Sequence, residues 1–162
     1  MHDMLVRLYA LPDLADALAA CAVDGVAIRR ALMPEKPVVV DWVRLHFPAA
    51  AAEVEAAFAR PPVTCFVALR GDRLAGFACH DVTCRNFFGP EGVAAAERGR
   101  GIGRALLLSA LHAQRAQGYA YAVIGGVGPA AFYAKAVGAV AIPESTPGIY
   151  AGMLRATGRP AS

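Results

Sequence analysis

A segment with alternating glycines, followed directly by an apolar run that favours helix, constrains the fold of this chain most. Residues 98–104 read RGRGIGR, and residues 105–111 read ALLLSAL. Glycine lacks a Cβ atom, so the backbone can approach a ligand closely. The first N–H groups of the following helix have no partner inside the helix, and the helix dipole makes this end positive. The pattern therefore predicts a phosphate-binding loop, with Arg98, Arg100 and Arg104 as additional cations.

The spacing of the glycines disfavours two common classes of phosphate-binding site. The loop lacks the Lys-Ser/Thr pair of an ATPase P-loop, and its Gly-x-Gly-x-Gly order differs from the Gly-x-Gly-x-x-Gly of dinucleotide sites. Arg98, Gly101 and Gly103 form Arg-x-x-Gly-x-Gly, with Val93 five residues earlier. This segment resembles the acyl-CoA loop of the GNAT N-acetyltransferase superfamily. An ordinary Arg/Gly-rich turn before a helix is the alternative interpretation.

A second segment carries the same resemblance. Residues 132–139, FYAKAVGA, are similar to the family's Phe-Tyr-x-Lys-x-Gly-Phe segment, with one extra residue before the glycine. Ala139 replaces the usual aromatic residue, Ala95 replaces a common proline, and Gly126 and Gly128 lie where an asparagine often opens the helix. These departures bear on the assignment to a subfamily more than on the resemblance to the superfamily.

Length and composition favour a single globular domain over residues 1–162. The sequence is 57% hydrophobic, which excludes a disordered chain, and 162 residues suit one core. The resemblance extends over residues 26–154, and residues 1–24 are an addition before the family's usual first strand. We expect this addition to pack against the core or against a second copy of the chain in a homodimer.

Charge and hydropathy limit the partners and the location. The net charge of +3 is mild, which suits an anionic cofactor but does not indicate a nucleic-acid partner. No apolar run approaches the roughly 20 residues of a membrane-spanning helix, and residues 1–7 do not form a signal peptide. We therefore expect a cytoplasmic enzyme without a membrane partner.

The cysteine pattern does not favour a metal site. Cys21, Cys65, Cys79 and Cys84 show no Cys-x-x-Cys spacing. Cys79 and His80 lie near Cys84, but a second His/Cys pair at ligand spacing is missing. Reduced, buried thiols and no metal cofactor are the prediction.

Hydrophobic periodicity and turn signals predict an α/β (α+β) fold: a mixed, largely antiparallel twisted sheet flanked by helices, with an extra N-terminal strand and helix. The predicted strands are residues 4–11, 26–32, 63–70, 73–83, 93–95, 119–124 and a final pair, 139–142 with 148–154. The predicted helices are residues 12–23, 38–47, 49–60, one from the glycine loop to about Gly118, and 130–137.

The resemblance implies a reaction and a cofactor site. GNAT enzymes transfer an acetyl group from acetyl-CoA to an amine, usually by direct attack. In the family, the strand before the loop pairs with pantetheine, the loop N–H groups hold the diphosphate, and backbone dipoles polarise the thioester carbonyl. The implied cofactor-binding residues are Val93, Ala95, Arg98, Gly99, Arg100, Gly101, Ile102, Gly103 and Arg104.

The resemblance indicates one residue as the general acid but leaves several candidates for the general base. Tyr133 falls on the family motif, and a phenol with a pKa near 10 can protonate the departing sulfur. A core aromatic is its alternative role. His80, Asp81 and Glu91 are the candidate bases. Histidine has the most suitable unperturbed pKa, whereas a carboxylate would need burial to raise its pKa. In this family a chain of water molecules often serves instead.

The acceptor is the least determined partner. The candidate substrate-binding residues are Trp42, His46, Phe47, Phe87 and Phe88, although Trp42 and Phe47 could equally belong to the core. No acidic cluster indicates a polyamine, and no peptide groove is evident, so a small primary amine is the expected acceptor. A non-catalytic module that binds acyl-CoA or a metabolite is the second hypothesis, and an unrelated nucleotide-binding α/β domain is the third.

Overall fold

The computed structural model describes residues 1–154; residues 155–162 of the predicted domain lie outside the described part. Seven strands within residues 1–154 form one mixed sheet in the order β2-β3-β4-β5-β6-β1-β7. Neighbours are antiparallel except β5 and β6, which are parallel. The strands are β1 Met4–Arg7, β2 Val26–Arg30, β3 Cys65–Arg70, β4 Arg73–His80, β5 Phe87–Val93, β6 Tyr121–Ile124 and β7 Val140–Ala141. The predicted fold class is confirmed.

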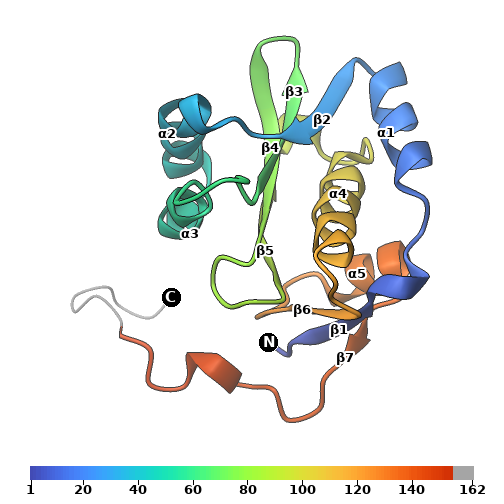
Figure 1. The fold of residues 1–162 in the computed structure, drawn as a ribbon, viewed down its shortest axis with the longest axis vertical. Coiled ribbons are helices and arrows are strands. Elements are labelled where there is room, and N and C mark those ends of the chain that lie inside the picture. Colours follow the sequence, from blue (N-terminus) through green and yellow to red (C-terminus); the bar gives the residue numbers. More distant parts are fainter. Residues whose placement is uncertain (155–162) are drawn as a thin grey trace.

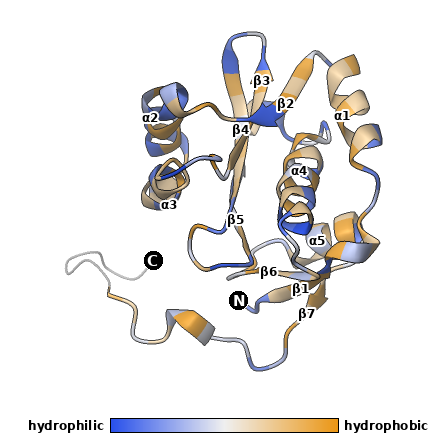
Figure 2. Cartoon of the chain, viewed as in Figure 1, coloured by the Kyte–Doolittle hydropathy of each residue, from blue (hydrophilic) through white to orange (hydrophobic). Residues whose placement is uncertain are grey.

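Helices cover both faces of the sheet (Figure 1). Helices α1 (Leu14–Val23), α4 (Ile102–Ala116) and α5 (Ala130–Val137) pack on one face. Helices α2 (Lys36–His46) and α3 (Ala51–Ala56) pack on the other. Two clusters of buried hydrophobic residues lie between these layers. The tip of the β3–β4 hairpin is hydrophilic (Figure 2). Helix α4 is buried along most of its length, so the helix that follows the glycine loop is anchored in the core.

The two parallel strands separate soon after they meet. Strands β5 and β6 pair only at Phe87 with Val123 and at Phe88 with Ile124. Beyond this point β5 stays paired with β4 as far as Val93, while β6 ends at Ile124. The edge of β5 from Gly89 to Val93 therefore has no strand beside it on the β6 side within the described residues. Its backbone groups border an opening in the sheet.

The N-terminal strand lies inside the sheet, next to the edge strand β7. Met4 of β1 lies opposite Ile124 of β6 and opposite Ala141 of β7. The predicted pairing of residues 139–142 with residues 148–154 is wrong, because β7 takes β1 as its partner and Gly148–Tyr150 forms a 3₁₀ turn. Pro147 directly precedes this 3₁₀ turn, and Pro143 and Pro147 both lie in the connection between the two predicted strands, where proline cannot donate a ladder hydrogen bond that would extend the pairing.

Several element bounds also differ from the prediction. The N-terminal strand ends at Arg7, and Leu8–Ala10 forms a 3₁₀ turn. The predicted helix over residues 49–60 is a 3₁₀ turn at Pro48–Ala50 followed by the short α3. The strand predicted at residues 93–95 is instead β5, which begins at Phe87, because pairing with β4 outweighs the loop propensity of its glycines and proline. The predicted helices 38–47 and 130–137 are confirmed as α2 and α5, with bounds within two residues.

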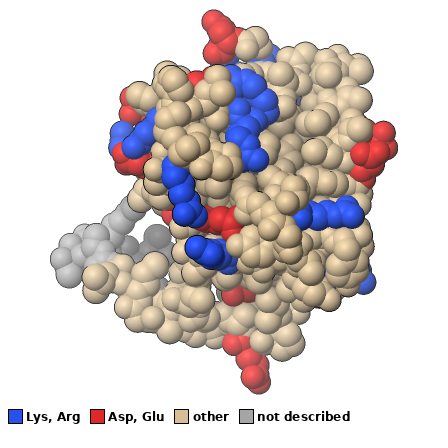
Figure 3. All heavy atoms as spheres, in the orientation of Figure 1, with Lys and Arg blue, Asp and Glu red and all other residues tan. Residues whose placement is uncertain are grey.

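Charged side chains of both signs are interspersed on the face shown in Figure 3. Within residues 1–154, no helix combines the length and the apolar composition that crossing a membrane requires. The same residues contain no cluster of three or more His, Cys, Asp or Glu side chains arranged to hold a metal ion.

Candidate active site

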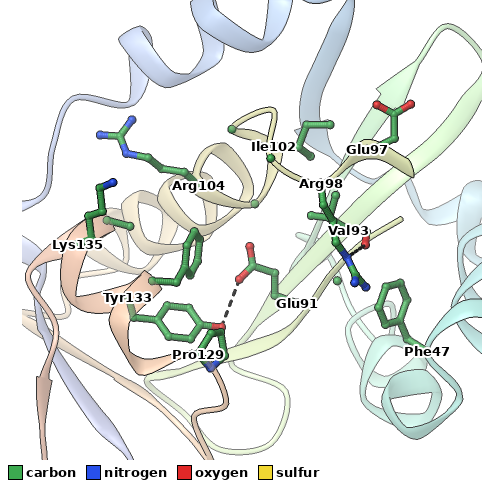
Figure 4. A pocket seen from close by; sticks show the side chains of 16 residues that line it. Phe47, Glu91, Val93, Glu97, Arg98, Ile102, Arg104, Pro129, Tyr133 and Lys135 are labelled. Carbon is green, nitrogen blue, oxygen red and sulfur yellow. Dashed lines mark hydrogen bonds between the residues drawn. The ribbon is translucent and has the colours of Figure 1, made fainter. Parts of the chain in front are cut away.

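A cavity of about 720 Å³ lies beside the opening between β5 and β6. Its walls come from the end of β5, the glycine loop, the first turn of α4 and helix α5 (Figure 4). The lining residues are Phe47, Glu91, Gly92, Val93, Glu97, Arg98, Gly99, Gly101, Ile102, Gly103, Arg104, Pro129, Phe132, Tyr133, Lys135 and Ala136. One cavity thus joins the predicted phosphate loop to the predicted catalytic helix.

The glycine loop has the conformation that its sequence predicts. Gly99 and Gly101 have φ angles of 78° and 81°, in the left-handed region that side chains other than glycine rarely adopt. A Cβ atom built on either glycine would meet nothing within 4 Å, so the loop borders open space. Ala105 N donates to Gly101 O at 3.0 Å, and the N–H groups of residues 102–104 precede this first helical bond. This arrangement suits an anion.

Most predicted cofactor-binding residues line the cavity. They are Val93, Arg98, Gly99, Gly101, Ile102, Gly103 and Arg104. Arg98 Nε donates to Val93 O at 3.1 Å, which ties the loop to the end of β5. The remaining two do not line it. Ala95 begins the 3₁₀ turn η4 (Ala95–Glu97), and the Arg100 guanidinium lies 3.5 Å from Asp24 Oδ2.

A buried carboxyl group and a tyrosine hydroxyl face each other across the cavity. The Tyr133 hydroxyl lies 3.4 Å from Glu91 Oε2 (Figure 4). Glu91 Oε1 is buried and has no hydrogen-bond partner among the described residues. Burial raises the pKa of Glu91 to about 8, against the lowering effect of the Tyr133 hydrogen bond. Burial and the neighbouring Glu91 raise the pKa of Tyr133 well above its usual value, so this hydroxyl keeps its proton.

Local packing explains why Glu91 points into the cavity. Successive side chains of a strand alternate between faces, and the next residue along β5 is Gly92. A Cβ atom on Gly92 would lie 2.8 Å from atoms of both Phe47 and Phe77, so only glycine fits between these rings and β5. The close approach brings Phe47, which ends α2, to the cavity wall.

The other two candidate bases lie elsewhere. His80 Nδ1 is 2.7 Å from Asp81 Oδ2, and the Asn86 amide donates to Asp81 Oδ1. His80 is fully buried, and Asp81 borders a separate surface hollow of about 450 Å³. Although burial favours the protonated carboxyl group, the hydrogen bonds from His80 and Asn86 hold the pKa of Asp81 below its usual range. The structure does not bring this pair to Tyr133.

Of the candidate substrate-binding residues, only Phe47 lines the cavity. The Trp42 ring packs at a tilt against His46 and Phe47, with ring centroids 4.6 Å and 5.8 Å away. Phe88 packs in the core with its ring centroid 6.2 Å from that of Tyr133. Phe87 lies beside Gly125, 3.0 Å from where a Cβ atom would stand. Phe47 therefore lies between Trp42 and the cavity, and Trp42 does not line the cavity itself.

Sequence reasoning gave no site role to six residues of the cavity wall, which are Gly92, Glu97, Pro129, Phe132, Lys135 and Ala136. Lys135 and Arg104 occupy the same side of the cavity (Figure 4). Lys135 lies within the motif FYAKAVGA, so its position two residues after Tyr133 carried a signal. Phe47 is among the candidate substrate-binding residues, but its contact with β5 at Gly92 joins residues far apart in the sequence and could not be predicted.

Comparisons with known proteins agree with this geometry. A family model described as an acetyltransferase (GNAT) domain matches residues 61–136, a range that contains β3 to β5, the glycine loop and Tyr133. Together with the fold, this match supports membership of the GNAT superfamily. It supports acyl transfer as the general chemistry. No curated protein matches the chain.

Three solved structures share the fold at low sequence identity. The GCN5-related glucosamine N-acetyltransferase region of a fungal multi-domain β-N-acetylglucosaminidase is 16% identical, with a TM-score of 0.72 over 87% of this chain and 19% of that one. A GCN5-related N-acetyltransferase from Sphaerobacter thermophilus is 18% identical, with a TM-score of 0.64 over 87% and 48%. A Drosophila protein is 17% identical, with a TM-score of 0.59 over 87% and 47%. This chain therefore spans less than half the length of each.

Proposed function

We propose that this protein binds acetyl-CoA in the cavity and transfers the acetyl group to the primary amine of a small molecule. The observation that carries the proposal is the pairing of Glu91 and Tyr133 in the same cavity that the glycine loop lines. Phosphate-binding features and an acid–base pair in one cavity support acyl transfer from a CoA thioester to an amine.

Three groups of the chain are suited to hold acetyl-CoA. The open left-handed glycines and the N–H groups at the start of α4 fit the diphosphate. Arg98 and Arg104 add positive charge at the cavity wall. The free edge of β5 up to Val93 offers backbone groups that would pair with the amide groups of pantetheine. In this binding mode the thioester would lie between the edge of β5 and helix α5, near Glu91 and Tyr133.

The reaction is then direct attack of the neutral amine on the thioester carbonyl carbon. A carbon–nitrogen bond forms and the carbon–sulfur bond breaks. The Glu91 carboxylate accepts the proton that the attacking nitrogen loses, and its raised pKa suits that task near neutral pH. The Tyr133 hydroxyl donates a hydrogen bond and a proton to the departing sulfur, and the proton held by Glu91 returns Tyr133 to its neutral form. The products are an amide and CoA with a free thiol.

Release of CoA thiol from acetyl-CoA tests the proposed chemistry. The assay uses a panel of an amino sugar, an amino acid, an arylamine and a polyamine, and we expect release to depend on one class of amine. The fungal glucosamine N-acetyltransferase region of like fold makes glucosamine a reasonable first acceptor. Binding of CoA without thiol release for any amine would favour the non-catalytic module instead.

Calorimetry of CoA binding tests the site itself. Gly101→Val and Gly103→Val should abolish binding, because each adds a side chain on the path of the diphosphate. Gly71→Val is the matched control for Gly101→Val. Gly71 also has a positive φ, of 63°, and open space around it, but it lies at the tip of the β3–β4 hairpin. Failure of the unaltered protein to bind CoA would overturn the proposal.

A further inference from the structure

Four charged side chains meet behind the glycine loop, and they come from four separate segments. Asp24 lies in the turn between α1 and β2, and Arg70 ends β3. Glu97 ends the 3₁₀ turn η4, and Arg100 belongs to the glycine loop. We call these four residues the loop brace. None of them except Glu97 lines the cavity.

Arg70 is the centre of the loop brace. Its guanidinium binds both oxygens of Glu97, with Nε to Oε1 and Nη2 to Oε2 each at 2.8 Å. Nη2 is also 3.0 Å from Asp24 Oδ2, and Nη1 donates to the Asp24 carbonyl oxygen. Arg100 lies at the outside, with Nη1 3.5 Å from Asp24 Oδ2 and Nε 3.9 Å from Glu97 Oε2. Hydrogen bonds from Arg70 lower the pKa of both acids, which therefore stay ionised at neutral pH.

The position of Glu97 creates an electrostatic conflict. Its side chain is only 19% exposed, and the residue lines the cavity that carries the anion-binding loop, with its carboxylate directed away from Glu91 and Tyr133 (Figure 4). A carboxylate without a partner at this place would repel a diphosphate, because like charges in a partly desolvated site oppose binding. Bidentate binding by Arg70 cancels that charge and also holds η4 against β3.

We infer that Arg70, held in place by Asp24 of the N-terminal segment, is a positioning residue that neutralises Glu97 and so sets the affinity of the glycine loop for a diphosphate. The inference rests on the proposed function, since it concerns the binding of CoA at that site. It also gives the N-terminal segment a part in ligand binding, through Asp24, besides its strand in the sheet.

A pair of substitutions separates charge neutralisation from a merely structural role. Arg70→Ala should raise the KM for acetyl-CoA and the Kd for CoA by roughly fivefold, the upper range for a partly exposed ion pair, and leave kcat unchanged. Dephospho-CoA should lose the same factor, because it keeps the diphosphate. Adding Glu97→Gln should restore affinity, since no unpaired carboxylate remains. A structural role for Arg70 predicts no such rescue, so persistent weak binding in the double variant would overturn the inference.

Arg29→Ala is the matched control. Arg29 also forms a bidentate pair, with Glu35, but at the start of α2 and away from the cavity lining. Its loss should leave the Kd for CoA unchanged. If Arg70→Ala does not fold, Arg70→Gln carries the same expectation with a smaller change in volume. Binding of CoA by the unaltered protein, together with equal binding by the Arg70 variant, overturns the inference alone. No binding by the unaltered protein overturns the proposed function.

Discussion

Glu91 and Asp81 are both shielded carboxylates beside a polar partner, but their surroundings differ in kind. Asp81 accepts hydrogen bonds at both oxygens, from His80 and from the Asn86 amide, and its pKa lies below the usual range. Glu91 has one distant partner, the Tyr133 hydroxyl at 3.4 Å, and one buried oxygen without any among the described residues. Its pKa is raised to about 8.

The contrast shows which surroundings give a carboxylate a structural role and which give it the properties of a general base. Hydrogen bonds to the charged form stabilise it and use up its lone pairs, so Asp81 holds the β4–β5 connection in place. A carboxylate that is buried without such bonds keeps an affinity for a proton and a free oxygen to receive it. Since Glu91 also borders the cavity, the comparison favours Glu91 over Asp81 as the base.

The largest effect should come from Glu91→Gln. Removal of the general base should lower kcat by about 100-fold or more, because general-base catalysis typically contributes 10²–10⁴. The Kd for CoA, measured by calorimetry, should stay near that of the unaltered protein. Glu55→Gln, on the exposed side of α3, is the control for a change of charge alone. Full activity of Glu91→Gln would contradict the assignment of Glu91 as the general base.

A smaller loss is expected for Tyr133→Phe. The substitution keeps the ring that packs against Phe88 and Phe132 but removes the hydroxyl. Turnover should fall by roughly 10- to 100-fold, the low end of the range for a general acid, with CoA affinity retained. Tyr121→Phe, which changes a partly exposed tyrosine paired with Tyr9, is the matched control. Unchanged turnover would reduce Tyr133 to a packing residue.

The raised pKa of Glu91 should appear in the pH dependence. Glu91 must lose its proton before it can act as a base, so kcat should rise by about tenfold from pH 7 to pH 9, through the pKa of about 8. In Glu91→Gln this step should disappear and leave only the titration of the acceptor amine. A profile that is identical in both proteins would contradict the assignment.

The same pKa makes a prediction about stability. The native state holds a proton on Glu91 that the unfolded state, with the ordinary pKa of 4.5, has released. The contribution of Glu91 to stability is therefore full below pH 4.5 and is lost as pH rises toward about 8. Denaturant titrations should show that the unaltered protein loses stability relative to Glu91→Gln over this interval.

The smallest effect on turnover should come from Asp81→Asn. Asn tolerates the positive φ of 56° at this position but gives up the charge-assisted hydrogen bond with His80. We expect a lower melting temperature, from a loss of about 1 kcal/mol, and a kcat within about twofold of the unaltered protein. A large fall in kcat without a change in melting temperature would return Asp81 to the catalytic candidates.

The parts of the fold that were predicted well are those that local chemistry decides. Helices α2 and α5 follow from apolar spacing and from a proline within one residue of the helix start. The β3–β4 hairpin follows from Gly71-Asp72 between two apolar runs. Strand β5 was missed because Gly89, Pro90 and Gly92 favour a loop locally, and only its pairing with β4 makes this segment a strand.

The sequence by itself determined the glycine loop, the helix that follows it and the tyrosine motif, because each depends on residues within one or two turns of each other. The tertiary structure alone decided three things that bear on function. It inserted β1 between β6 and β7. It brought Glu91 to Tyr133, 42 residues apart, and Asp24 to Arg100, 76 residues apart. Such contacts result from competition among all strands and faces for partners, which no short stretch of sequence encodes.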